Sequence, residues 1–311
     1  MDEVYVGIDV SKDRLDIHVL PSGEAFAVAR DGKSLQGLVE RLKAMTLHLI
    51  ALEATGGYET VVTAALAGAG LPLAVVNPAQ VRQFAKGLGL RAKTDPIDAF
   101  AIARFAATVK PAPRTAPSQE ALILAELVAR RRQLVEMASA ERQRKSQARN
   151  GRVRKSIERH IALLEKELSE IDKEIGTLVR ASQVWREKED LLASVPSVGQ
   201  TSARLLIAEL PELGTLTRRK IASLVGLAPF ARQSGTFKGK TAISGGRTKI
   251  RSTLFICALV ASRHNPVLRA FYRHLLQDRR LSKMAALVAV ARKLLTILNA
   301  ILRDRRPWQN A

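Results

Sequence analysis

The stretch VYVGIDV, residues 4–10, decides the fold of the first part of the chain. It is rich in β-branched residues, as strands are, and an aspartate stands next to its end. Working outward, strand-like segments follow at residues 14–20 (RLDIHVL) and 25–29 (AFAVA), then a helical segment at residues 34–45, then the strand-like LHLIALEA at residues 47–54. Strands and helices that alternate in this way up to about residue 108 predict an α/β domain.

The Pro-rich segment KPAPRTAPSQ, residues 110–119, ends this alternation and marks a domain boundary. Beyond it the pattern is helical, and apolar residues recur in alternating four- and three-residue steps, the seam of a coiled coil. These seam residues are Ile157, Ile161, Leu164, Leu168, Ile171, Ile175 and Leu178. Residues 191–210, LLASVPSVGQTSARLLIAEL, fit either a helix-hairpin-helix whose glycine loop binds phosphate or an ordinary helix turn.

The composition indicates a polyanionic partner. Fifty Lys and Arg residues against 29 Asp and Glu residues give the 311-residue chain a formal net charge of +21, and nucleic acid is the leading candidate. No apolar run reaches about 18 residues, and the acidic start MDEVYVGIDV is unlike a signal peptide, so we expect a cytoplasmic protein without a membrane span. The single cysteine, Cys257, lies in an apolar run, which predicts a buried thiol and excludes disulfides and Cys-rich zinc sites.

Four carboxylates stand where a strand or helix would end, and we refer to them as the quartet. Asp9 and Glu53 end strand-like runs, whereas Asp95 and Asp98 are three residues apart and would share one face of a helix. Converging carboxylates hold two Mg²⁺ ions about 3.5–4 Å apart in phosphoryl transfer, and hard oxygen ligands suit this metal. For the last pair an alternative stays open, because Asp95 before Pro96 is typical of an N-cap and Asp98 would favour the helix dipole.

Other titratable residues are not expected to belong to the catalytic site. Asp13, Asp16 and Glu59 lie near the quartet in sequence, and the alternation of its strand predicts that Asp16 faces solvent. The five histidines show no metal-ligand spacing. We therefore expect the histidines to be solvated or structural.

The segment GLAPFARQSGTFKGKTAISGGRTKIR, residues 226–251, combines glycines, basic residues and serines. Glycine lets a backbone approach a ligand closely, and lysines and arginines attract phosphate. The segment therefore fits either a flexible nucleic-acid clamp or a loop in which one serine is a nucleophile. No histidine in the loop would activate that serine, so bound metal has to help.

The motifs VGIDVSK, ALEATGGYE, TDPIDAFAIARF, VPSVGQTSARLLIAELPELG, LVGLAPF and SGTFKGKTAISGG occur in this order along nearly the whole chain. They resemble those of the transposases of the IS-one-ten superfamily, in particular its IS-eleven-eleven group. The resemblance implies a RuvC-like domain of the ribonuclease H fold with a DEDD quartet, a coiled-coil linker and a mostly α-helical C-terminal transposase domain with a nucleophilic serine. Matched by motif, the DEDD residues are Asp9, Glu53, Asp95 and Asp98, and the serine is Ser234, with Ser244 as its competitor.

The resemblance also implies the partners and the reaction. Members of this superfamily are guided by a structured noncoding RNA, the bridge RNA, which pairs with donor and target DNA. The expected protein is thus a bacterial, nucleoid-associated recombinase that cuts and rejoins DNA through a phosphoserine intermediate with the assistance of Mg²⁺. Its expected domains are a RuvC-like catalytic domain at residues 1–110, a Pro-rich linker with a coiled coil at 111–185, and the transposase domain at 186–311.

Two other functions remain open at this point. One is a RuvC-like, metal-dependent junction nuclease with a DNA-binding C-terminal domain, in which water attacks and Ser234 only binds phosphate. The other is a nucleic-acid scaffold without catalysis. Detection of a covalent adduct between protein and DNA separates the three.

Basic residues in two segments are predicted to bind nucleic-acid backbone. Those between Arg130 and Arg159 would take the guide RNA, with a solvated helix face as the alternative, and those in the serine loop would take phosphate. The predicted residues are Arg142, Arg144, Lys145, Arg149, Arg152, Arg154, Lys155, Lys238, Lys240 and Arg247.

The seam also predicts self-association. It needs a partner helix, and the preceding helix places Arg131 and Arg142 where apolar residues are wanted. We therefore expect a homo-oligomer, a dimer or tetramer, whose working site combines the quartet of one protomer with Ser234 of another.

Overall fold

The computed structural model describes residues 3–54, 57–90, 94–113, 118–230, 233–234, 237–238 and 241–309, with backbone alone at 233–234 and 237–238. The chain forms two compact units, Met1–Pro117 and Ser118–Ala311. The second unit joins the long helices that follow the Pro-rich segment to the C-terminal helices. The expected three-part division of the chain stays a prediction.

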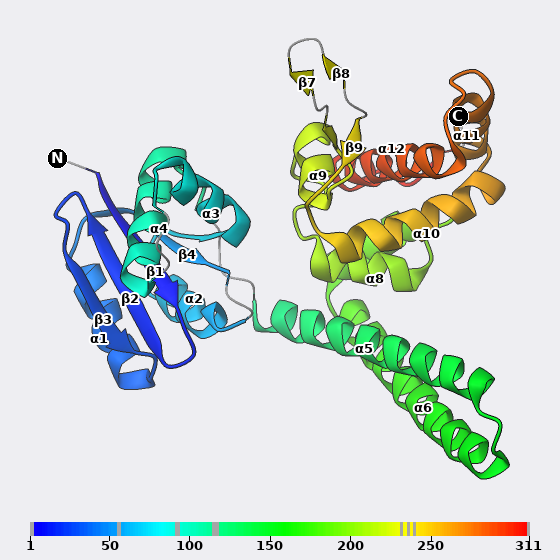
Figure 1. The fold of residues 1–311 in the computed structure, drawn as a ribbon, viewed down its shortest axis with the longest axis horizontal. Coiled ribbons are helices and arrows are strands. Elements are labelled where there is room, and N and C mark those ends of the chain that lie inside the picture. Colours follow the sequence, from blue (N-terminus) through cyan, green and yellow to red (C-terminus); the bar gives the residue numbers. More distant parts are fainter. Residues whose placement is uncertain are drawn as a thin grey trace. The chain divides into compact units, whose positions relative to one another are not determined.

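The first unit is built on one mixed sheet (Figure 1). Its strands are β1 (Val4–Val10), β2 (Arg14–Leu20), β3 (Ala25–Ala29), β4 (Leu47–Glu53) and β5 (Leu73–Val76), in the order β3-β2-β1-β4-β5. β1, β2 and β3 are antiparallel neighbours, whereas β4 is parallel to both β1 and β5. This arrangement confirms the α/β prediction.

Helices cover both faces of this sheet. The alternation of side chains sends Val6, Ile8 and Leu52 into one core with α1 (Gly32–Lys43) and α2 (Glu59–Gly68). It sends Tyr5, Leu49 and Ala51 into the opposite core with α3 (Pro78–Gly87) and α4 (Asp95–Val109). Because strand side chains alternate between faces, odd-numbered residues of β1 and β4 point toward α3 and α4.

Gly7 lets α4 lie directly on β1. A Cβ atom at this position would stand 2.3 Å from both Ala103 N and Ala99 O, which are backbone atoms of α4. Any larger residue would therefore push the helix off the strand. This close approach brings the first turn of α4 to the end of β1.

The second unit begins with a hairpin of two long helices, α5 (Gln119–Gln147) and α6 (Gly151–Ala181), which run antiparallel (Figure 1). Asn150 caps α6 by accepting hydrogen bonds from the backbone of Arg152 and Val153. The predicted seam is confirmed as the packing face of α6, with Leu164 and Ile175 buried.

The partner of that seam is α5 of the same chain, so the inference of self-association from an unpartnered seam is wrong. The two arginines that disfavoured α5 form ion pairs with acidic residues of α6. Arg131 Nε lies 2.6 Å from Asp172 Oδ1, and Arg142 Nη2 lies 2.7 Å from Glu165 Oε1. Long arginine side chains keep their charged ends at the edge of a helix contact, which lets the apolar seam close beneath them.

The remainder of the second unit is mostly helical, as predicted. Its helices are α7 (Gln183–Ala193), α8 (Gln200–Glu209), α9 (Arg218–Val225), α10 (Thr248–His264), α11 (Pro266–Gln277) and α12 (Lys283–Asp304). Two short strand pairs, β6 (Pro229–Phe230) with β9 (Ala242–Ile243) and β7 (Gln233–Ser234) with β8 (Phe237–Lys238), lie between α9 and α10. The interpretation of α7, α8 and their turn as a helix-hairpin-helix stays a prediction.

Helix α12 is the core helix of this unit. It is the one described helix that is long and apolar enough to cross a membrane, and half of its most apolar window is buried inside the protein. Its buried side chains pack with those of α8, α9 and α10 in one cluster that includes Cys257. The cysteine is buried and unpaired, as predicted.

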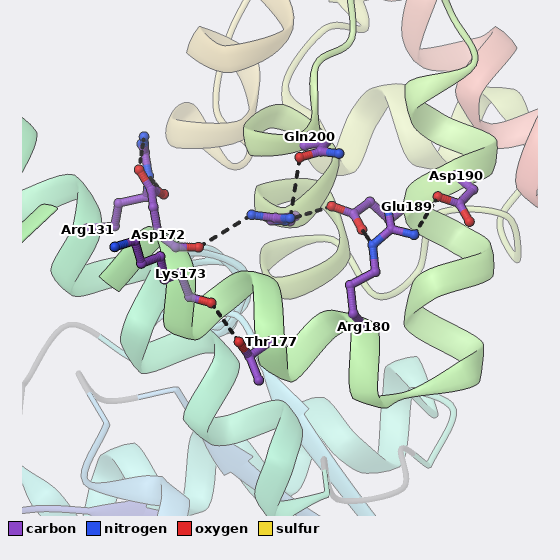
Figure 2. Close-up of polar contacts among 9 residues, drawn as sticks. Arg131, Asp172, Lys173, Thr177, Arg180, Glu189, Asp190 and Gln200 are labelled. Atoms are coloured by element: carbon purple, nitrogen blue, oxygen red, sulfur yellow. Dashed lines mark hydrogen bonds and ion pairs between the residues drawn. The ribbon is translucent and has the colours of Figure 1, made fainter. Parts of the chain in front are cut away.

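A buried carboxylate ties α6, α7 and α8 together (Figure 2). Glu189 of α7 is fully buried, and its Oε1 accepts a 2.7 Å hydrogen bond from Arg204 Nε of α8. Its Oε2 makes a 2.8 Å ion-pair contact with Arg180 Nε of α6, although that N–H is not aligned for a hydrogen bond. Arg180 also contacts Asp190 at 3.0 Å. This cluster fixes the junction between the long hairpin and the C-terminal helices.

Candidate active site

The quartet converges at one end of the sheet in the first unit. Asp9 lies near the end of β1, Glu53 is the last residue of β4, and Asp95 and Asp98 occupy the first turn of α4. Strand alternation places Asp9 and Glu53 on the face that α4 covers. All four side chains line one cavity of about 540 Å³.

The quartet carries strong mutual repulsion. Burial is the main cause that raises the pKa of Asp9 from its ordinary 3.8 to about 6, and the charges of Asp98, Glu53, Asp95 and Asp16 raise it further. Like charges in a partly buried site disfavour simultaneous ionisation. The cavity is therefore a place where a cation would be stabilised.

Oxygen donors of this kind fit Mg²⁺, which prefers carboxylates and water to nitrogen or sulfur ligands. In the described part of the chain, no three His, Cys, Asp or Glu side chains are already gathered tightly enough to hold a metal ion. The four quartet carboxylates share one cavity, and their donor chemistry fits the metal.

The N-cap interpretation of Asp95 is wrong. The N-cap of α4 is Thr94, whose backbone carbonyl accepts from Asp98 N at 2.9 Å, and Asp95 is the first helical residue. Both aspartates still favour the positive end of the helix dipole. Capping therefore does not account for Asp95, whose side chain lines the cavity.

Asp16 does not face solvent, contrary to the sequence prediction. It is 4% exposed, and it pairs directly with Asp9 across the β1–β2 ladder. Arg14 holds its carboxylate, with Nη2 2.6 Å from Oδ1 and Nε 3.0 Å from Oδ2. The register of the β1–β2 hairpin could have predicted this placement. Directly opposed residues of an antiparallel pair project to the same face, so Asp16 shares the face of Asp9.

The rim of the cavity is organised by Arg30. Its Nε donates to the carbonyl of Lys12 at 2.6 Å, its Nη1 donates to the carbonyl of Tyr58 at 3.2 Å, and its guanidinium lies 5.1 Å from the Tyr58 ring centroid. Lys12 and Tyr58 both line the cavity. The β1–β2 turn and the start of α2 are thereby joined at the opening.

Three cations line the same cavity, and sequence reasoning did not single them out. They are Lys12 of the β1–β2 turn and Arg82 and Lys86 of α3. Arg82 and Lys86 are four residues apart, which places them on one face of the helix. The cavity therefore presents carboxylates and basic side chains together.

The serine candidates lie in the second unit. Ser234 is in β7, opposite Phe237 of β8, and Ser244 is exposed. For Ser234 and Lys238 the structure describes the backbone alone, and Lys240 lies outside the described residues. Ser234 thus belongs to a short strand pair between α9 and α10.

Arg247, the last predicted phosphate ligand of this loop, is engaged within the protein. Its Nη1 and Nη2 lie 2.6 and 2.7 Å from the two carboxylate oxygens of Glu212, and Nη1 also donates to the carbonyl of Glu209 at 3.0 Å. A two-pronged pair of this kind fixes geometry strongly. Arg247 thus anchors the start of α10 to the segment after α8.

The basic segment of the α5–α6 hairpin divides into two groups. Four of its predicted ligands contact acidic side chains of the hairpin: Arg142, Arg144, Lys145 and Arg154. The other three, Arg149, Arg152 and Lys155, have no carboxylate partner among the described residues. Arg152, Lys155 and Arg159 line an open groove at the tip of the hairpin.

Two family models match the chain in order. The DEDD model of the IS110 group, described as a transposase, matches residues 6–148, and the model described as "Transposase IS116/IS110/IS902 family" matches residues 189–273. Two curated relatives match along their length. The pilin gene-inverting protein of Moraxella bovis is 29% identical over 320 residues, which cover 99% of this chain and 98% of the relative. That of Moraxella lacunata is 28% identical with the same coverage.

Solved structures of RuvC from Thermus thermophilus are also similar to part of the chain. RuvC in complex with a Holliday junction substrate is 21% identical, with a TM-score of 0.28, over 36% of this chain and 99% of that one. The second RuvC structure is 22% identical, with a TM-score of 0.27, over 35% and 98% of the two chains.

Proposed function

This chain belongs to the IS110 (IS-one-ten) family of transposases, and on that premise we propose that it is an RNA-guided DNA recombinase that cuts and rejoins strands through a phosphoserine intermediate. The observation that carries the proposal is the convergence of Asp9, Glu53, Asp95 and Asp98 on one cavity. Three separate elements would not bring four repelling carboxylates together for stability alone, because the repulsion costs folding energy. The relatives named as pilin gene-inverting proteins support a reaction in which DNA strands are rejoined.

Ser234 would be the nucleophile. Its hydroxyl oxygen forms a bond to a backbone phosphorus, the bond from that phosphorus to a deoxyribose oxygen breaks, and the serine proton passes to the departing oxygen. The hydroxyl oxygen of a second strand then forms a bond to the phosphorus of the phosphoserine, the bond from that phosphorus to the serine oxygen breaks, and the proton of the attacking hydroxyl passes to the serine oxygen. In each step one phosphoester bond forms and one breaks, so the number of these bonds stays constant. Strands can therefore be rejoined without an external energy source.

The quartet residues would hold Mg²⁺, expected as two ions. When bound, the metal supplies positive charge that polarises the phosphate and favours ionisation of a hydroxyl. The pKa of Asp9 is raised to about 6, so this carboxyl must lose its proton for the full set of ligands to form. Activity should accordingly fall as the pH drops below about 6.

The tip of the α5–α6 hairpin would bind the guide RNA. Arg149, Arg152 and Lys155 have no carboxylate partner among the described residues and can approach phosphates directly. Arg142, Arg144, Lys145 and Arg154 would exchange exposed carboxylates for phosphates, and exposed ion pairs are worth only about 0–1 kcal/mol each. Neutralising the first three should reduce the salt dependence of RNA binding by about 2–3 in logarithmic slope. An unchanged slope would leave a solvated helix face as the better interpretation.

We also propose a homo-oligomer, a dimer or tetramer, with a composite site. The seam is closed within the chain, but Val153 and Leu163 on the outside of the hairpin are 49% and 54% exposed and could pack against another copy. Two inactive variants, Ser234→Ala and Asp95→Asn, should then regain partial activity when co-expressed. Mixed oligomers that stay inactive would mean that each site is built within one chain.

The decisive experiment is detection of a covalent adduct between protein and DNA. Ser234→Ala should abolish the adduct, whereas the matched control Ser244→Ala should keep it. Removal of any quartet carboxylate should abolish metal-dependent cleavage while the protein stays folded. Cleavage without an adduct would point to a junction nuclease in which water attacks, and binding without cleavage would point to a scaffold.

A further inference from the structure

The wall of the quartet cavity that α3 supplies is basic. Asn77 starts this helix by accepting a hydrogen bond from Ala79 N, and Pro78 fixes its first turn. Val81 is buried in the core beneath the helix and anchors it. The orientation set by Val81 turns Arg82 and Lys86 toward the cavity, where Lys12 joins them from the β1–β2 turn.

Three other cations of the first unit are held by carboxylates. Arg14 pairs with Asp16, Arg41 with Glu24, and Lys110 with Glu3. Lys12, Arg82 and Lys86, by contrast, form no ion pair with any residue that the structure describes, although four carboxylates line the same cavity. Their side chains are exposed and their charges are available to an anion from solvent.

We propose that Arg82, Lys86 and Lys12 form a binding site for the backbone phosphates of the DNA strand that is cut, an inference that rests on the proposed function. A nucleic-acid backbone carries one negative charge per nucleotide, so two cations one helical turn apart match successive phosphates better than an isolated anion. The quartet repels phosphate, and the cations that line the same cavity offset that repulsion. The arrangement holds the strand across the carboxylates.

The observations favour the DNA strand over the guide RNA as the occupant. The cations share their cavity with the residues proposed to act on the cut phosphate, so the strand that they hold is the one presented for cleavage. The proposed RNA site lies on the hairpin of the other unit. These residues are thus positioning residues for the substrate.

The test compares Arg82→Gln/Lys86→Gln with the matched control Lys33→Gln/Lys43→Gln, which removes the same charge from exposed positions on α1, across the sheet from the cavity. Binding of a short fluorescent DNA duplex to the full-length protein is measured by anisotropy in EDTA over a series of salt concentrations. Loss of two phosphate contacts should lower the logarithmic salt slope by about 2 in the first variant. The control should keep the wild-type slope.

Each possible result decides the proposal. Equal slopes for the two variants would overturn it, and so would a lower slope with an RNA duplex of the same sequence but not with DNA. Both variants should keep the wild-type melting temperature, because exposed substitutions change stability little. The anisotropy measurement in EDTA requires no reaction. Failure to find the Ser234 adduct would therefore reject the proposed chemistry but would leave the result of the binding comparison valid.

A cleavage assay in Mg²⁺ gives a second measurement. The Arg82→Gln/Lys86→Gln variant should require more DNA for half-maximal cleavage, while its maximal rate changes less.

Discussion

Replacing Asp9 by asparagine should make the metal-free protein more stable at neutral pH. The unfolded chain releases the Asp9 proton near pH 3.8, whereas the folded protein releases it near pH 6. Between these values the folded state binds more protons than the unfolded state, so the wild-type protein loses stability as the pH rises through this window. Above about pH 6 the full penalty of the ionised, partly buried carboxylate is present.

The size of the effect follows from the two pKa values. Their difference corresponds to at most about 3 kcal/mol, at about 1.4 kcal/mol for each pKa unit. Asp9 is only half-buried, and solvent screening reduces the expected gain to about 1–2 kcal/mol. Asparagine has nearly the same shape and no charge, so the gain should raise the melting temperature by about 3–6 °C.

The assay is thermal unfolding in EDTA, with the wild-type protein, Asp9→Asn and the exposed control Asp13→Asn compared across pH. The gain of Asp9→Asn should vanish below about pH 4, where both states of the wild-type protein carry the proton. Added Mg²⁺ should stabilise the wild-type protein more than the variant, because binding to the folded state alone raises stability. A variant that is no more stable than the wild-type protein at neutral pH in EDTA would refute the reasoning that burial and neighbouring charges penalise the ionised Asp9 carboxylate.

Three further predictions follow from the packing and the charges. Gly7→Ala should lower stability by about 3 kcal/mol or more in chemical unfolding and abolish cleavage, because its Cβ would stand 2.3 Å from backbone atoms of α4. Glu189→Gln should cost about 3 kcal/mol in the same measurement, since it removes the charge of a fully buried carboxylate that holds the partly buried Arg204. Asp16→Asn should keep cleavage but move the acid limb of its pH profile to lower pH, because the negative charge of Asp16 raises the pKa of Asp9. A pH profile that stays where it is in the wild-type protein would mean that the charge of Asp16 does not affect Asp9.

The α/β unit and its carboxylates could be predicted because both depend on local pattern. Strand-like runs that end in Asp9 and Glu53 fix which edge of a sheet carries those side chains, and a three-residue spacing fixes the shared face of Asp95 and Asp98. What places α4 against β1 is the missing Cβ of Gly7. That contact joins residues nearly a hundred positions apart in the sequence, and no local sequence pattern predicts it.

The misplaced residues depended on partners that are distant in sequence. Asp16 was expected at the surface because alternation gives two faces but does not say that helices cover both of them. The seam of α6 was expected to lack an internal partner because Arg131 and Arg142 looked out of place on α5. Their ion pairs with Asp172 and Glu165 solve that problem across the hairpin. Both errors came from judging a polar side chain without its neighbour.

The net charge of +21 likewise shows little about where phosphate can bind. Much of the basic run in the hairpin is matched by acidic residues of α6, and Arg247 of the serine loop is held by Glu212. Among the described residues, cations without an ion-pair partner remain at the hairpin tip and, less obviously, in the cavity that holds the quartet. Affinity for a polyanion depends on these unmatched charges, because a cation that already holds a carboxylate must give up that contact before it can bind phosphate. Arg82 and Lys86, two isolated residues within a short helix, should therefore contribute more to DNA binding per residue than the arginine-rich segment that dominates the composition.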